Sequence, residues 1–149
     1  MKLLRILAIV LVAYVGLGLM FDSVIGSLQP QFDGTVVLRT YEPGGGGAKD
    51  TVLSLLDDDG QLWVESGHWF RGWYRRVQAN NDVELTHNGQ TAPYRAVPDE
   101  SPETLAHVTD LMKRANGGGY YVARTMLLWA PIKPVRLEPK TEATPAPAP

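Results

Sequence analysis

The most informative segment of this chain is Gly67-His68-Trp69-Phe70-Arg71-Gly72-Trp73-Tyr74-Arg75-Arg76, which holds four aromatic residues, three arginines and one histidine. Solvated surfaces rarely carry so much aromatic area, and buried cores rarely carry three guanidinium groups. The combination is typical of a groove that stacks on a flat ring and binds an anion, because arginine is a planar, permanently charged fork. A short amphipathic helix is the alternative, and it would bury every fourth residue and leave the arginines in water.

The segment follows a predicted strand. Residues 61–66 alternate between apolar and polar side chains, and they follow Asp57-Asp58-Asp59-Gly60, a tight turn between two apolar runs. Residues 71–79 are predicted to form a short helix, whose first N–H groups would favour an anion. The three aspartates are explained by the turn, because a calcium loop needs alternating ligands and a distal glutamate. We therefore predict no metal site.

The other elements follow from periodicity and turn residues. Strands are predicted at 35–41 and 50–56, on either side of a loop, 42–48, that contains four consecutive glycines. Asn88-Gly89 predicts a hairpin between strands 83–86 and 90–97. A helix at 102–115, capped by Ser101, and a strand at 132–137 complete the domain. The predicted fold class is α+β, mostly β: a six-stranded antiparallel sheet closed into a small barrel, with two inserted helices.

The N-terminus carries an unbroken apolar run from Ile6 to Phe21, preceded by Lys2 and Arg5. With Leu3 and Leu4 it approaches the roughly 20 residues that cross a bilayer core. No clear cleavage site follows, which favours an uncleaved single-pass anchor over a removed signal peptide. The predicted organisation is an anchor at 1–21, a linker at 22–34, a domain at 35–138 and a disordered Pro/Ala tail at 139–149. The two positive residues before the apolar run predict a cytoplasmic N-terminus. Two charges do not decide on which side of the membrane the domain lies.

Composition excludes several kinds of site. The 149-residue chain has no cysteine, so disulfides, thiolate zinc sites, iron–sulfur clusters and cysteine nucleophiles are absent. A formal net charge of −2 gives no general attraction to nucleic acid, and we predict no nucleic-acid partner. No Ser-His-Asp order, paired-carboxylate motif or HExxH motif supports hydrolysis, and no catalytic residue is assigned.

The order of the elements resembles the deazaflavin-dependent nitroreductase family, one of the split β-barrel flavin reductases, which are similar in fold to pyridoxamine phosphate oxidase. The resemblance covers roughly Thr35 to Glu138. The residues that carry it are Ser66-Gly67, Trp73-Tyr74-Arg75, Gln78-Ala79-Asn80-Asn81-Asp82-Val83-Glu84-Leu85, the Asn88-Gly89 hairpin and Val135-Arg136-Leu137-Glu138.

The resemblance implies a coenzyme site. In such proteins the loop after the first strand and the Ser-Gly/Trp-Tyr segment hold the phosphate and the ring. The implied cofactor-binding residues are Lys49, Ser66, Gly67, His68, Trp73, Tyr74 and Arg75, and Tyr120 and Tyr121 are implied on the substrate side. The family pattern Thr-x-Gly-Arg-Lys-x-Gly is replaced here by Thr40-Tyr41-Glu42-Pro43-Gly44-Gly45-Gly46, which lacks the basic pair. Only Lys49 matches the later basic position.

The resemblance also implies a function, a membrane-anchored oxidoreductase that passes a hydride from coenzyme F-420, or alternatively FMN, to a quinone-like or nitroaromatic acceptor. Split-barrel relatives are often homodimers. The missing basic pair leaves a second hypothesis open, a non-catalytic split-barrel module that binds haem through His68 or holds another ligand. A third hypothesis is a module that binds RNA or lipid headgroups through the Trp/Arg segment.

Overall fold

The computed structural model describes residues 2–29, 31, 33–68 and 71–140. Trp69 and Phe70, and the tail from residue 141, lie outside this range, so the predictions made for them are not tested here. Four α-helices are present, α1 (Lys2–Leu28), α2 (Gly72–Ala79), α3 (Pro102–Asn116) and α4 (Gly119–Met126), with a 3-10 turn at Pro43–Gly45. The seven strands are β1 (Thr35–Tyr41), β2 (Ala48–Ser54), β3 (Leu56–Asp58), β4 (Gln61–Ser66), β5 (Asp82–His87), β6 (Gln90–Pro98) and β7 (Lys133–Pro139).

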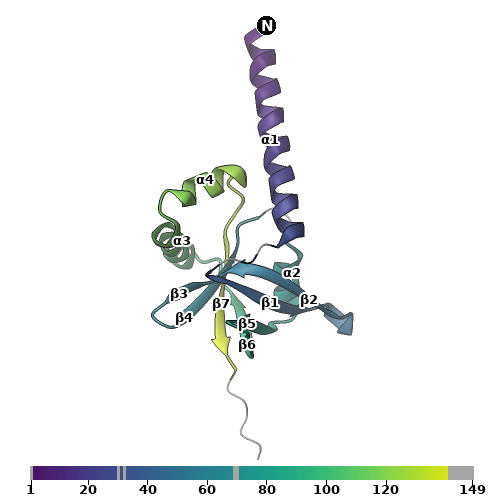
Figure 1. The fold of residues 1–149 in the computed structure, drawn as a ribbon, viewed down its shortest axis with the longest axis vertical. Coiled ribbons are helices and arrows are strands. Elements are labelled where there is room, and N and C mark those ends of the chain that lie inside the picture. The colour runs from purple at the N-terminus through teal and green to yellow at the C-terminus, as the bar shows by residue number, and fades with distance from the viewer. Residues whose placement is uncertain (1, 30, 32, 69–70, 141–149) are drawn as a thin grey trace, which may run out of the picture.

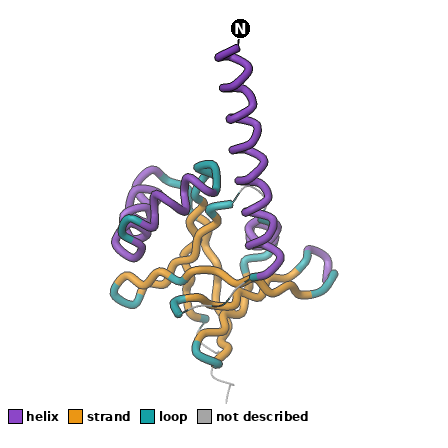
Figure 2. The backbone as a smooth tube through the Cα atoms, turned by 45° about the horizontal axis from the view of Figure 1, so that its top comes forward, coloured by secondary structure: helices purple, strands orange, loops and turns teal. Residues whose placement is uncertain are grey.

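The strands form one antiparallel sheet in the order β2-β1-β5-β6-β7-β4-β3. Strands β2 and β3 lie at opposite edges of this sheet, yet Leu55 alone connects them in the chain. The sheet must therefore curl until its two edges meet, which gives the half-barrel seen in Figures 1 and 2. The predicted α+β antiparallel class is confirmed.

The predicted number of six strands is wrong. The run predicted as one strand at 50–56 is divided at Leu55, because its two parts have different partners. Residues up to Ser54 pair with β1. Leu56 pairs with Trp63 of β4, across the turn at Asp59 and Gly60.

The core lies inside the curl and is covered by α2. Trp73, Tyr74 and Val77 of this helix are buried against side chains of β1, β5 and β7, among them Leu38, Leu85, Val135 and Leu137. The burial of Trp73 and Val77 that the amphipathic-helix alternative predicts is confirmed, but Arg71 and Arg76 are only partly exposed, so the arginines do not all lie in water. A second cluster of Leu56, Trp63, Val108 and Leu111 holds α3 on the sheet. Figure 2 shows the α-helices grouped at one end of the strands.

Helix α1 projects away from the sheet (Figure 1) and is long and apolar enough to cross a membrane. It continues beyond Phe21 into the segment predicted as a linker and ends at Leu28. Asp22 does not end the helix, because its side chain is buried and bonded to the ring of His68. The chain then reaches β1 within a few residues, so the helix is fixed to the domain.

Helix α4 is an element that the sequence did not predict. It follows Gly117 and Gly118, begins at Gly119, and lies mostly in the segment expected to be mixed in structure. After Met126 the chain turns sharply, with positive φ angles at Leu128 and Trp129, and enters β7. The helix and this turn lie beside α1, as Figure 1 shows.

Candidate functional site

A small polar pocket of about 160 Å³ opens where β4 ends and α2 begins. Its lining comes from three elements and the segment between them. Ser66 is the last residue of β4, and it lies directly opposite Lys133, the first residue of β7. The full lining is Ser66, His68, Arg71, Tyr74, Arg75, Gln78 and Lys133.

The pocket gathers positive charge, part of which is offset: Asp22 and Glu65 act on Arg71, and Glu100 binds Lys133. Among the described residues, neither Arg71 nor Arg75 has a carboxylate within ion-pair distance. Other arginines do: carboxylates pair with Arg39, Arg76, Arg114 and Arg136. Unpaired guanidinium groups that line a hollow are the donors expected at a phosphate or carboxylate site.

Tyr74 and Lys133 form one side of the pocket and share a carboxylate. The Tyr74 hydroxyl donates to Glu100 Oε1 at 2.7 Å, and Lys133 Nζ donates to both Glu100 oxygens at 3.0 and 3.1 Å. Burial and this hydrogen bond raise the pKa of Tyr74. The hydrogen bonds from Tyr74 and Lys133 lower the pKa of Glu100. Tyr74 therefore stays protonated at neutral pH, and its ring position is fixed.

His68 brings an uncharged ring into the pocket. Burial and the nearby Arg71 lower its pKa, although the bond to Asp22 acts in the opposite direction. Because a carboxylate can only accept, Nδ1 carries the proton that is shared with Asp22. In the neutral ring Nε2 is then a free acceptor. The contact also attaches α1 to the wall of the pocket.

Glu65, next to the pocket in sequence, has a buried Oε2 atom with no hydrogen-bond partner among the described residues. Glu65 precedes Ser66 on β4, and burial raises its pKa while Arg124 and Arg71 counteract the rise. Gly67 packs closely against Glu65, because a Cβ atom at this position would lie 2.8 Å from Glu65 Oε2 and would displace that side chain. Gly67 therefore acts through close packing, and no side chain from it enters the pocket.

A second hollow, of about 240 Å³, shares Arg75 with the first. It is lined by Glu42, Pro43, Gly72, Arg75 and Arg76, so the loop after β1 meets the start of α2, as the family resemblance implies. Lys49 lies outside both linings. Its amino group pairs with Glu42 Oε1 at 3.2 Å, at the edge of this hollow.

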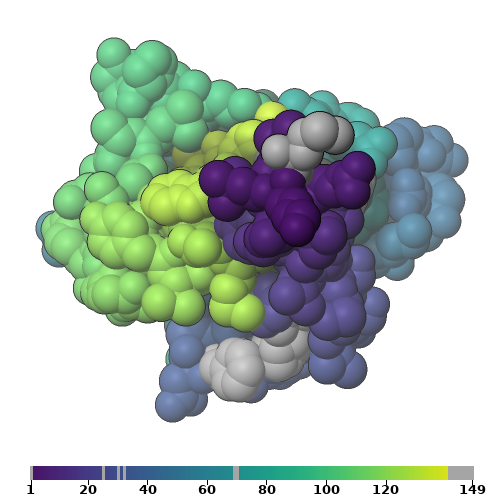
Figure 3. Space-filling model, turned by 90° about the horizontal axis from the view of Figure 1, so that it is seen from above, coloured from purple at the N-terminus to yellow at the C-terminus, as the bar shows by residue number. Residues whose placement is uncertain are grey.

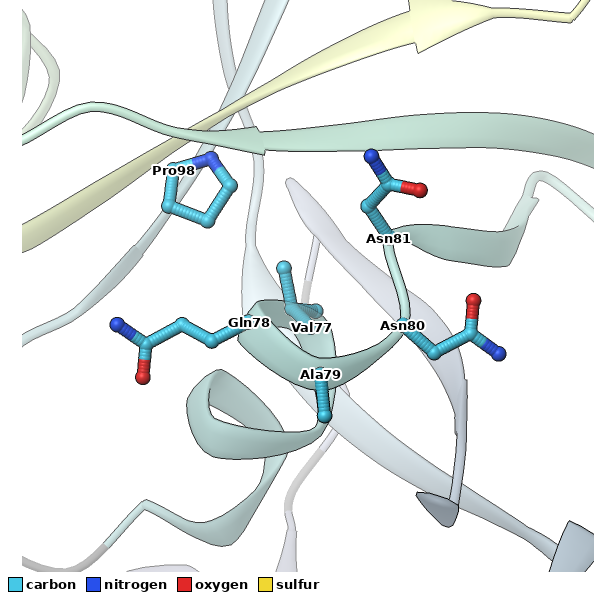
Figure 4. Close-up of a pocket in the computed structure, with 6 residues that line it drawn as sticks. All are labelled: Val77, Gln78, Ala79, Asn80, Asn81 and Pro98. Atoms are coloured by element: carbon cyan, nitrogen blue, oxygen red, sulfur yellow. The ribbon is translucent and has the colours of Figure 1, made fainter. Parts of the chain in front are cut away.

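A larger hollow of about 570 Å³ lies at the C-terminal end of α2 (Figure 4). It is lined by Val77, Gln78, Ala79, Asn80, Asn81 and Pro98. Figure 4 shows its three carboxamides pointing in different directions, and none of these lining side chains is charged. Ligand sites need convergent polar groups, so this hollow is the weaker candidate.

The structure brings four of the predicted site residues, Ser66, His68, Tyr74 and Arg75, into one pocket. Trp73 instead lies in the core with 1% of its surface exposed. Tyr120 and Tyr121 lie on α4 and line neither hollow. Sequence reasoning missed Gln78, Lys133 and Asp22.

The His68 ring should titrate below its ordinary pKa of about 6.5. As the pH falls, the unfolded chain then takes up this proton before the folded chain does. This group therefore contributes stability above about pH 6.5, and that contribution is lost as the pH falls towards the folded-state pKa. An NMR titration of the three histidine rings in the detergent-solubilised chain measures the pKa directly.

The exposed His87 serves as the internal reference for that titration. Replacing Asp22 with asparagine should lower the His68 pKa further, because the Asp22 carboxylate raises it. A His68 pKa above that of the unfolded chain, or a rise in the Asp22→Asn chain, would contradict this account.

No protein-family model and no curated protein matches the chain. Several solved structures match it. A structure described as a domain-swapped dimer is 19% identical, with a TM-score of 0.59 over 72% of this chain and 82% of that one. An F-420-H2-dependent reductase is also 19% identical, with a TM-score of 0.55 over 71% and 95%. HutZ, the haem storage protein of Vibrio cholerae, is 16% identical, with a TM-score of 0.57 over 72% and 82%.

At these identities the similarity establishes the fold, and it agrees with the curled sheet and its covering helix. The similar structures also include a putative pyridoxamine 5'-phosphate oxidase. The chain therefore has the split β-barrel fold that is found in F-420-H2-dependent reductases and pyridoxamine phosphate oxidase-like proteins.

Proposed function

We propose that this protein is a membrane-anchored oxidoreductase that passes a hydride from a reduced deazaflavin or flavin coenzyme to a lipophilic, quinone-like or nitroaromatic acceptor. The observation that carries the proposal is the pocket lined by Arg71 and Arg75 in a split β-barrel, where Arg75 has no carboxylate partner among the described residues. A coenzyme with a phosphate and a flat ring needs such donors beside a surface that can face the ring.

The residues present fit such a coenzyme. Arg75 lines both hollows, which measure about 160 and 240 Å³, so an anion bound at Arg75 would lie at the edge of each. Arg75, with Arg71 and Arg76 on either side, would hold phosphate. Ser66 and His68 would face the ring, because a hydroxyl and an unprotonated Nε2 complement its polar edge.

The coenzyme supplies the hydride when it is bound, and the protein orients it. Arg75, which lines both hollows, would hold the anionic end of the coenzyme. His68 offers a hydrogen-bond acceptor whose direction is set by Asp22. Lys133 keeps positive charge at the rim, although Glu100 offsets part of it. These roles position the reacting groups and require no side-chain nucleophile.

The lipophilic acceptor is supported by the position of α1. Asp22 of this helix bonds to His68 in the pocket wall, so the pocket lies close to the end of the apolar helix. If α1 anchors the protein, the pocket lies near the membrane surface. A second copy of the chain could complete the open pocket, and the domain-swapped dimer with a similar fold supports a homodimer.

Titration of the full-length chain in detergent micelles with F-420, FMN and haem tests the proposal. The full chain is needed because α1 contributes Asp22 to the site. Saturable quenching of tryptophan fluorescence by F-420 or FMN is expected, since Trp73 packs against Tyr74 with 5.9 Å between the ring centroids. Failure of both to bind would overturn the reductase.

Haem binding is the second candidate function. It is favoured by the similarity to HutZ and by the free Nε2 of His68, which is a suitable axial ligand. A haem Soret band that His68→Ala abolishes, together with no binding of F-420 or FMN, would establish this alternative in place of the reductase.

A further inference from the structure

Helix α4 and the turn after it expose an apolar surface, which we name the α4 patch. It consists of Tyr121, Val122, Met126 and Trp129, which are 53%, 62%, 41% and 52% exposed. Val122 and Met126 are four residues apart and lie on one face of α4, and Trp129 lies in the turn that follows the helix. An exposed, contiguous apolar surface of this kind marks a contact with a partner or a membrane.

The opposite face of α4 carries the charge. Arg124 is only 6% exposed, and its guanidinium lies 5.5 Å from the centroid of the Trp129 ring. Its Nε and Nη1 have no hydrogen-bond partner among the described residues. The helix therefore buries Arg124 together with Tyr120 while it exposes Tyr121, Val122 and Met126, so large apolar side chains face outward where a surface helix normally carries polar ones.

The patch adjoins α1. The Tyr14 hydroxyl donates to the backbone oxygen of Thr125 at 2.6 Å. Leu128 fills the space left by Gly18, where a Cβ atom would lie 2.6 Å from Leu128 Cγ. Figure 3, seen from above, shows yellow-green atoms of this region against the purple atoms of α1.

The contacts with α1 fix the depth of the patch. At about 1.5 Å per residue, Gly18 and Tyr14 lie about 6 and 12 Å from Asp22, towards the N-terminus. A bilayer core of about 30 Å needs about 20 helical residues, and counting these back from Asp22 reaches Leu3. If the bilayer ended before Tyr14, residues 3–13 would span only about 16 Å. If α1 crosses the bilayer, α4 therefore lies at the depth of the bilayer.

We infer that the α4 patch lies in the lipid bilayer, at the boundary between headgroups and acyl chains, beside α1. This inference rests on the proposed anchoring of the protein by α1. Tyr121 and Trp129 have the amphipathic rings that gather at this boundary. The domain is then held on the membrane by two elements, and Gly18 with Leu128 joins them.

Site-directed spin labelling of the full-length chain tests the inference. The chain has no native cysteine, so single variants can be labelled cleanly. Val12→Cys reports on α1, Val122→Cys on the α4 patch, and Gln90→Cys on the exposed β5–β6 hairpin. Each is placed in phosphatidylcholine/phosphatidylglycerol vesicles, and the accessibility of the label to oxygen and to a water-soluble nickel chelate is measured.

We expect the labels at residues 12 and 122 to favour oxygen and to be shielded from nickel, and the label at residue 90 to show the opposite. A lipid-embedded label at residue 12 with a nickel-accessible label at residue 122 overturns the inference and leaves the anchor intact. Nickel access at both positions overturns the anchor and the inference together.

A measurement on the native side chain guards against a label that disturbs α4. In vesicles of dibrominated phosphatidylcholine, the intact chain should lose fluorescence relative to unbrominated vesicles. The Trp129→Phe chain should lose less, because Trp73 is buried in the core. Equal quenching of the two chains would place Trp129 away from lipid and count against the inference.

Discussion

An Arg75→Ala chain should bind the coenzyme about 10- to 100-fold more weakly than the native chain. Arg75 lines both hollows and has no carboxylate partner among the described residues, so its guanidinium is available to a ligand. A hydrogen bond to a charged group contributes about 1.5–3 kcal/mol, and about 1.4 kcal/mol corresponds to a tenfold change in affinity. Fluorescence titration with F-420 or FMN measures the loss.

The matched control for Arg75 is Arg95→Ala. Arg95 is an exposed arginine on β6 and belongs to the lining of neither hollow. Both substitutions should leave the free energy of unfolding nearly unchanged, because both side chains are solvent-exposed. Equal losses of affinity in the two chains would show that bulk charge is responsible and that Arg75 makes no specific contact.

Trp73→Ala should destabilise the fold by about 3–5 kcal/mol. Trp73 is almost fully buried and fixes α2 to the inside of the curled sheet. The loss is a large share of the roughly 5–15 kcal/mol that stabilises a domain, and it should also loosen the pocket wall that α2 supplies. Chemical denaturation followed by circular dichroism in detergent measures the change.

The Trp73→Phe substitution separates the effect of apolar packing on stability from the effect of the buried indole N–H group. The Trp73 Nε1 atom is buried without a hydrogen-bond partner in the described structure. Phenylalanine removes this unpaired donor and keeps most of the apolar volume, so the cost should stay below about 1.5 kcal/mol. A loss as large as that of Trp73→Ala would mean that the indole nitrogen has a partner outside the described residues.

Local sequence signals predicted the local parts of the fold. Asp59-Gly60 and Asn88-Gly89 both have positive φ angles at their two residues, as the tight hairpin turns require. The break at Leu55 could not be predicted in this way, because it depends on which strand pairs with each half of the run. Helix α4 was missed because several of its apolar side chains are exposed. Its sequence therefore lacks the apolar stripe that a helix packed on the core normally shows.

The residues of the candidate site also divide into those that are close in the sequence and those that only the fold brings together. Ser66, His68, Tyr74 and Arg75 are close in the sequence, and a strand followed by a helix is enough to group them. Lys133 reaches the pocket only through the pairing of β7 with β4, which sets it opposite Ser66. Asp22 was predicted to be the first residue of a linker. Its contact with His68 is a tertiary one that no local pattern contains.

The position of β7 has a consequence for how the chain is assembled during synthesis. This strand is the seventh in chain order, yet it lies inside the sheet, where Leu137 pairs with both Leu62 of β4 and Ala96 of β6. Until residues 133–139 leave the ribosome, the β3–β4 hairpin has no strand to join it to the rest. Non-local pairing of this kind is slow to form. The apolar helix α1 therefore emerges before the strands, and the half-barrel beside it closes only after β7 has been made.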